Sequence, residues 1–398
     1  MSPETPNPEH AGAPDDAVAR LARGGNAFAF DLYRQLRALG GNLVLSPASV
    51  STALAMTWAG ARGATASQMK TALHLDGSVD GVLAASGRLT SMLEDARRPI
   101  RFRIANRLFG EKTFDFESAY LTRIRAAFGA PMELLDFRLG PELARRHING
   151  WVADKTEDRI RDLLPGSAIT DDTRLVLVNA IDFLGDWETP FETVRTRPAA
   201  FRKTAGESVE VPTMNRTGTI RHVSRDGLSA IELPYRGGDM SMVLVVPEAV
   251  DGLAALEASL NADTLDALIA DLTPRHVWMA VPKFEIAPTA SLSLGAPLVA
   301  LGMGDAFDRS KADFTAMADP PSPADRLAID EVYHKAFVKV DEKGTEAAAA
   351  TAVVMQRAAT AVVQHIAFKA DRPFLFFIRD RKSGLILFMG RVVDPSVT

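Results

Sequence analysis

The sequence predicts an α+β fold built as one domain. Helical periodicity dominates the first half of the chain, whereas alternating and β-branched runs dominate the second half. The two patterns do not alternate regularly, which excludes a doubly wound parallel sheet. No internal repeat and no Pro/Gly-rich linker interrupts the body, so we expect a single domain over residues 25–398. Residues 1–24 are rich in Pro, Ala, Asp and Glu, and we expect them to form a disordered extension.

Apolar residues recur at helical spacing through the first half of the chain. The first such stripe predicts a helix over residues 26–39. The second helix is expected to begin at Ser46-Pro47, because a hydroxyl that can cap a helix precedes the residue best tolerated in a first turn. Further helices are expected over residues 65–75, 79–95, 116–128, 141–156 and 253–272.

Strand patterns follow from residue 174 onward. We expect strands over residues 175–183, 209–214, 228–233, 240–246 and 277–286. The run from Val332 to Val340 also alternates, and its apolar parity includes His334. A last aromatic and β-branched run covers residues 366–377 and is interrupted only at residues 369–373.

Composition excludes several classes of function. The 398 residues are 47% apolar and 24% charged, and the net charge is −5, so neither nucleic acid nor an anionic membrane surface is expected as a partner. No apolar run reaches membrane-spanning length. The absence of cysteine excludes disulfides, thiol catalysis and thiolate metal sites. The chain shows no signal peptide, so we expect a cytoplasmic protein, or a secreted or periplasmic one if an upstream signal was removed.

One short run carries most of the functional information. It consists of Gly344, Thr345, Glu346, Ala347, Ala348, Ala349, Ala350 and Thr351, and it joins two strand-like segments. Composition alone is compatible with a helical turn or a linker, because Ala favours helices. If the strand parity continues, Glu346 lies on the outer face. The inner face then carries only small or apolar residues, namely Thr345, Ala347, Ala349, Thr351, Val353 and Met355. Such a segment could enter a sheet as an extra strand.

Motifs spread along the chain point to one family. They are Asn42–Ser49 with Thr52–Met56, Asn106–Phe109, Asn179–Ile181 with Trp187 and Phe191, His334–Phe337 with Asp341–Thr351, Phe368–Ile378, and Phe388–Val392 with Asp394-Pro395. In this order, from about residue 27 to the end, they resemble the serpin family. The resemblance is to an inhibitory, prokaryote-like (bacterial) member. It implies three β-sheets, eight or nine helices and an exposed reactive-centre loop over about residues 342–364.

The resemblance also implies a function. A serpin of this type is a suicide-substrate inhibitor, not an enzyme, and its partner is a serine endopeptidase held as a covalent acyl complex. Some cysteine proteases form a further target class. We expect a monomer without cofactor or metal. The alternative is a non-inhibitory serpin acting as a carrier or chaperone, which the small residues of the hinge disfavour.

The family spacing places the reactive bond near the end of the loop. Fourteen residues on from Gly344, the bond lies between Ala358 and Ala359, which favours elastase- or subtilisin-like proteases with small pockets. A loop shorter by one residue makes Arg357–Ala358 the reactive bond and the target trypsin-like. The sequence leaves both open.

Other functional residues are carried over from the family motifs. Ser46, Ser49, Asn179 and His334 are expected to form a polar cluster beneath the central sheet that controls whether two strands part. We expect protonation of His334 below about pH 6 to loosen this sheet.

Trp187 and Glu342 are expected where the loop enters the sheet. Parity directs Glu342 toward the protein body, and an ordinary surface carboxylate is the alternative.

Other site chemistries find little support. The seven histidines are scattered without a metal-binding pair at helical spacing, and neither a phosphate-binding Gly-rich loop nor a nucleophile elbow is present. A group of arginines, at positions 97, 98, 101, 103 and 107, is preceded by Glu94 and Asp95. Because no basic stripe forms, we do not expect glycosaminoglycan binding.

Overall fold

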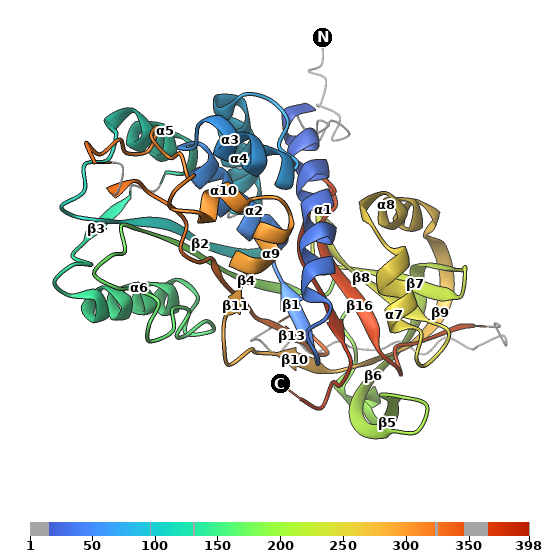
Figure 1. Ribbon diagram of the computed structural model, residues 1–398. Coiled ribbons are helices and arrows are strands. Elements are labelled where there is room, and N and C mark those ends of the chain that lie inside the picture. Colours follow the sequence, from blue (N-terminus) through green and yellow to red (C-terminus); the bar gives the residue numbers. More distant parts are fainter. Residues whose placement is uncertain (1–15, 96, 130–131, 323–324, 346–364, 398) are drawn as a thin grey trace, which may run out of the picture.

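The computed structural model describes residues 16–95, 97–129, 132–322, 325–345 and 365–397. Within them the chain forms two hydrogen-bonded sheets and ten α-helices, which confirms the α+β class (Figure 1). Most of the reactive loop, including the bonds at residues 357–359 and the hinge residues 346–351, lies outside the described residues.

The eight-stranded sheet, here called the central sheet, contains the expected loop-entry strands. Its order is β10 (Phe284–Ile286), β13 (Val338–Val340), β14 (Gly344–Thr345), β4 (Leu175–Asp186), β12 (Tyr333–Ala336) and β11 (Leu292–Ser293). On the other edge of β4, β2 (Ile100–Glu111) pairs antiparallel, and β3 (Glu133–Leu135) pairs with β2.

The nine-stranded sheet consists of two parts that share one long strand. Its order is β1 (Leu43–Leu45), β17 (Ile386–Val392), β16 (Phe374–Asp380), β8 (Met240–Pro247), β7 (Leu228–Pro234), β6 (Ser208–Arg225), β9 (Thr273–Pro282) and β15 (Ile366–Lys369), and β5 (Arg197–Arg202) also pairs with β6. The last residues of β6 pair with β7, and its earlier residues pair with β5 and β9. With the central sheet, these two parts give the three sheets that the serpin resemblance implied.

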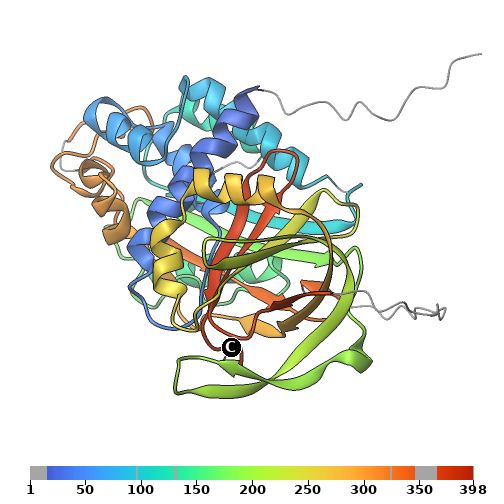
Figure 2. The same cartoon turned by 90° about the vertical axis from the view of Figure 1, so that its right-hand side faces the viewer.

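The helices surround the sheets on several sides. They are α1 (Asp16–Leu36), α2 (Pro47–Trp58), α3 (Gly63–Ala72), α4 (Val79–Leu93), α5 (Ser118–Phe128), α6 (Pro141–Lys155), α7 (Leu253–Ser259), α8 (Ala262–Asp271), α9 (Gly295–Ala300) and α10 (Gly304–Phe307). Helices α2 to α5 gather at one end, α6 lies alongside β2 and β4, and α7 and α8 flank β7 to β9 (Figures 1 and 2). None of the helices in the described part of the chain is long and apolar enough to cross a membrane.

Aromatic side chains fill the space between the sheets. Phe102 of β2 and Phe183 of β4 meet edge to face, and both rings contact Phe388 of β17. Large buried rings of this kind fix how two sheets sit on each other, because they gain most from burial and tolerate few packing geometries. The central sheet therefore has a firm support on this face.

Three expected elements differ from the structure. The expectation that residues 1–24 are disordered is wrong for residues 16–24. They begin helix α1, where Val18 and Ala22 are buried. The expected helix over residues 253–272 is two helices, because Asn261 caps a new helix with a reciprocal side-chain bond to Thr264. The expected strand over residues 277–286 divides after Pro282, and its two halves belong to different sheets.

Candidate functional site

The central sheet is weakly joined along one line. Strand β12 runs parallel to β4 and pairs with it at three positions, His334 with Asn179, Lys335 with Ala180, and Ala336 with Ile181. We call this line of contact between β4 and β12 the seam. Strand β4 has twelve residues, so the seam occupies only a small part of its edge.

A buried polar cluster holds the seam on one face. The Ser46 backbone N–H donates to His334 Nε2 at 3.0 Å, and the other ring nitrogen lies 3.0 Å from Asn179 Oδ1. Since Nε2 accepts, Nδ1 carries the proton and donates to Asn179. The Asn179 amide in turn donates to Ser49 Oγ at 2.6 Å. The structure thus brings together Ser46, Ser49, Asn179 and His334, the four residues expected to form this cluster.

Ser46 also connects this cluster to the neighbouring elements. It is the N-cap of α2, accepting from the Ser49 N–H at 3.4 Å, as expected of the Ser46-Pro47 helix start. Its hydroxyl donates to the Leu387 carbonyl of β17 at 2.6 Å. Because this hydroxyl does not bond His334, the pair is not arranged as a nucleophile and its base.

Burial determines the charge of His334. The side chain is fully buried, and this burial lowers the pKa of His334 to about 3. The expectation that the sheet loosens below about pH 6 stays a prediction, because opening the seam would return His334 to its ordinary pKa near 6.5 and let it take up a proton. The folded protein keeps this imidazole neutral down to about pH 3, since an imidazolium would also place an N–H against the Ser46 N–H.

The opposite face of the seam is held by a lysine. Lys335 is buried, and its ammonium donates to the carbonyls of Arg161 at 2.9 Å and Thr289 at 3.1 Å. Burial lowers the pKa of Lys335. Parting the seam therefore disturbs polar contacts on both faces of the sheet.

The first two hinge residues already pair with β4, at the end of its edge that lies above the seam. Strand β14 pairs Gly344 with Asp186 and Thr345 with Gly185, while Thr345 also faces Val340 of β13. A Cβ on Gly344 would lie 2.0 Å from the Gly185 carbonyl oxygen, so only glycine permits this approach. Thr345 is 1% exposed, and its pairing from both sides makes it a strand residue of the sheet.

An aromatic pair lies beneath this first hinge pairing. The Tyr235 hydroxyl is 2.6 Å from the Thr345 hydroxyl, and its ring stacks on Trp187 with centres 4.7 Å apart. The Trp187 indole N–H donates to the Asp341 carbonyl at 3.0 Å. Trp187 therefore lies against the segment that leads into the hinge.

Glu342 points into the body, as its parity indicated. It is 7% exposed, forms an ion pair with Lys283 at 2.8 Å and accepts from the Thr196 hydroxyl at 2.8 Å. Burial acts to raise the pKa of Glu342, but hydrogen bonds from Lys283, the backbone and Thr196 outweigh it and lower the pKa. The carboxylate is thus charged at neutral pH and fixes the chain just before the hinge.

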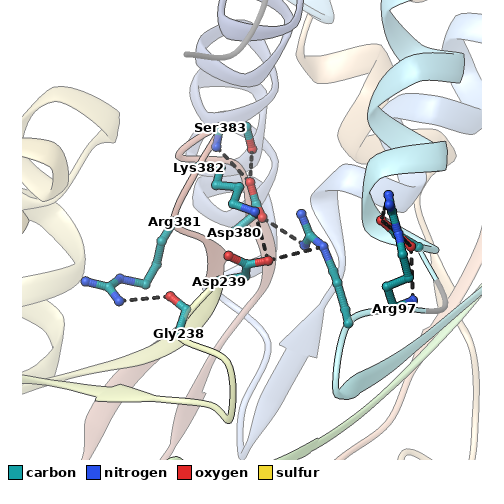
Figure 3. Close-up of polar contacts among 9 residues, drawn as sticks. Arg97, Gly238, Asp239, Asp380, Arg381, Lys382 and Ser383 are labelled. Carbon is teal, nitrogen blue, oxygen red and sulfur yellow. Dashed lines mark hydrogen bonds and ion pairs between the residues drawn. The ribbon is translucent and has the colours of Figure 1, made fainter. Parts of the chain in front are cut away.

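A partly exposed ion-pair network supports the turn that carries Tyr235. Arg98 bonds Asp380 at 3.1 Å and lies 3.6 Å from Asp239, whose other partner is Lys382 at 3.0 Å (Figure 3). Arg97 is paired locally with Asp95 (Figure 3). Arg107 pairs with Glu133 at 2.5 Å, so at least three of the five clustered arginines are committed to carboxylates.

Comparison with known proteins agrees with this geometry. The family model described as Serpin (serine protease inhibitor) matches residues 23–395. The chain belongs to the serpin family. The leukocyte elastase inhibitor of Sus scrofa is 38% identical to this serpin over 388 residues, which cover 95% of this chain and 100% of that protein.

Solved structures lead to the same family. Uncleaved ovalbumin matches with a TM-score of 0.83 and 27% identity, covering 94% of this serpin and 100% of that chain. Human thyroxine-binding globulin, complexed with thyroine, matches with a TM-score of 0.85 and 26% identity, covering 95% of this serpin and 99% of that chain. Seven of eight similar sequences come from eukaryotes and one comes from Thermococcus kodakarensis, so the expected prokaryote-like character is not confirmed and the expected bacterial character is not supported.

Sequence reasoning missed several members of this serpin's site. Asn106 accepts from both Asn179 and Ser49, and Lys335, Tyr235 and Lys283 hold the seam and the hinge. Asn106 could have been found, since it faces Asn179 across two adjacent strands. The lysines and the tyrosine carry no local signal, because each acts on a segment distant in sequence.

We expect the buried His334 to make the free energy of unfolding depend on pH. Its pKa is about 3 when folded and near 6.5 when unfolded, so between these values only the unfolded chain binds the proton. Acidification then favours unfolding, with a loss of about 1.4 kcal/mol per pH unit from this group. A His334→Gln variant should lose this part of the slope in denaturant unfolding measured from pH 7 to pH 4.

The wild type, measured over the same pH range, is the control. Equal slopes in wild type and the His334→Gln variant would show that His334 is not the titrating group.

Proposed function

We propose that this serpin is a suicide-substrate inhibitor of serine endopeptidases, with an elastase- or subtilisin-like or a trypsin-like target. The observation that carries the proposal is the hinge, because Thr345 is already paired between β13 and β4. A strand that has begun to form needs only to extend along β4. The similarity to leukocyte elastase inhibitors supports the same function.

In the proposed reaction the chain supplies the substrate bond. The protease serine attacks the carbonyl carbon of Ala358, or of Arg357 in the alternative register. The peptide bond breaks, its nitrogen takes a proton from the protease histidine, and an ester joins the two proteins. The loop upstream of the break then inserts into the central sheet, and the attached protease is carried along and distorted before water hydrolyses the ester.

The geometry of the seam supports insertion. Below it, a hollow of about 330 Å³ lies between Leu175–Leu177 at the start of β4 and the segment from Leu327 to Tyr333. Above the seam, the first hinge residues are already paired with β4. Only the three paired positions of the seam therefore remain to be separated. A new strand of about ten residues gains hydrogen bonds on both sides, and at about 1 kcal/mol each it releases on the order of 10 kcal/mol.

A carrier or chaperone role is the competing proposal. Thyroxine-binding globulin is a similar protein whose solved structure is complexed with thyroine. The hinge favours inhibition, because Thr345 is small and its strand is in register with β4. A carrier does not require a loop that can extend the central sheet.

A bulky charge at the hinge should convert the inhibitor into a substrate. Thr345→Arg places a guanidinium where the hydroxyl now lies 2.6 Å from that of Tyr235, so the loop cannot extend β14 at the required speed. Thr345→Ala is the matched control and should keep inhibition. Both variants are incubated with elastase and trypsin, and complexes that survive boiling in detergent are counted. A stable complex formed by the Thr345→Arg variant at the wild-type rate contradicts the insertion mechanism.

Cleavage of the loop should raise the melting temperature sharply. The inserted strand adds hydrogen bonds to β4 and β12 that the intact protein lacks, on the order of 10 kcal/mol by the count above. Scanning calorimetry of intact and nicked protein measures the change. A carrier without insertion would give equal melting temperatures.

The position of the reactive bond predicts the class of target. We expect elastase to cleave after Ala358, because its small pocket accepts alanine. The alternative register predicts cleavage by trypsin after Arg357 together with a stable trypsin complex. N-terminal sequencing of the released fragment after mild digestion separates the two, and trypsin cleavage without complex formation excludes the arginine register.

A further inference from the structure

Two histidines meet where the reactive loop returns to the body of the protein. His365 immediately precedes β15, and His276 lies on the neighbouring strand β9. The two strands run parallel, with Ile366 opposite Val277, so this register places His365 directly opposite His276. Both side chains are exposed, and their ring centres are 4.6 Å apart at an interplanar angle of 44°.

This separation suits a shared metal ion. A metal about 2.0–2.1 Å from a ring nitrogen lies about 3 Å from the ring centre, so two imidazoles on one ion have centres roughly 4.4–5.2 Å apart. The observed distance falls in that range. Neutral imidazoles are also the ligands that Zn²⁺, Cu²⁺ and Ni²⁺ prefer.

The surroundings leave room to complete the coordination shell. Thr219 faces His276 on the next strand, β6, and is small and exposed. Alternation along β9 directs Arg275 to the other face of the sheet, where its charge acts on His222. No group of three or more ligating side chains gathers within the described residues, so waters would supply the remaining positions.

We propose that His276 and His365 form a two-histidine site for a divalent transition metal that fastens β15 to β9. Strand β15 has four residues and pairs with β9 at the edge of its sheet. An edge strand this short is held by few hydrogen bonds. One ion bound to both strands would therefore slow their separation at the downstream root of the loop.

Zn²⁺ titration of the intact protein tests the site directly. At pH 7.5 in a non-coordinating buffer, calorimetry should show one equivalent bound to the wild type. His276→Ala and His365→Ala should each weaken this binding at least ten-fold. His147→Ala, which removes an exposed histidine elsewhere, should leave it unchanged. Since both site histidines are surface residues, circular dichroism should confirm that the variants are folded.

Amide hydrogen exchange tests the consequence for the strand. Zn²⁺ should slow exchange of the β15 amides several-fold in the wild type and leave it unchanged in His365→Ala. The proposal is overturned if wild type binds no Zn²⁺, if either site variant binds it as tightly as wild type, or if bound Zn²⁺ leaves β15 exchange unaltered. None of these readouts requires a protease, so they are independent of the proposed inhibition.

Discussion

The hydrogen bond between His334 and Asn179 is the constraint on which the rest of the structure depends. It joins the two strands of the seam at the first of their three paired positions, and it is fully buried. A neutral imidazole that donates on one side and accepts from Ser46 on the other has both ring nitrogens satisfied. Separating the strands leaves these groups without partners in an apolar interior, which costs about 1–3 kcal/mol per group. The seam is thus kept closed mainly by the free energy needed to break these buried hydrogen bonds, and less by the number of paired positions between the strands.

This arrangement explains why so few residues of β4 are paired on the loop side of the strand. The same strand pairs continuously with β2 on its other edge, whereas on the loop side its pairs are limited to β12 and the two residues of β14. Unused strand edge is normally covered or blunted, because it invites additional pairing. Here the hollow below the seam and the hinge above it lie at the two ends of one position along this edge of β4. In the proposed mechanism the loop fills that position.

The sequence predicted the fold class, most elements and the four polar residues of the seam, because these depend on local periodicity or on family motifs. It could not predict contacts between residues that are far apart in the sequence and that only the fold brings together. Lys283 meets Glu342 because β10 and β13 are neighbours, and His276 meets His365 because β15 returns beside β9. The break at Asn261 was visible in principle as a capping residue, but the apolar periodicity on both sides concealed it.

The two ends of the loop, here called its roots, are attached to the protein body in different ways. This difference bears on why the proposed insertion would require cleavage of the chain. The upstream root is anchored inside the central sheet at Thr345, while the downstream root leaves from the edge strand β15. From Gly185 to Leu175, a strand beside β4 needs about ten residues, at roughly 3.3 Å each. The nineteen residues 346–364 would then retain only about nine to climb back to His365, so insertion of an uncut loop pulls on β15. In the proposed mechanism, scission removes this tether, so cleavage by a protease would trigger the extension of β14.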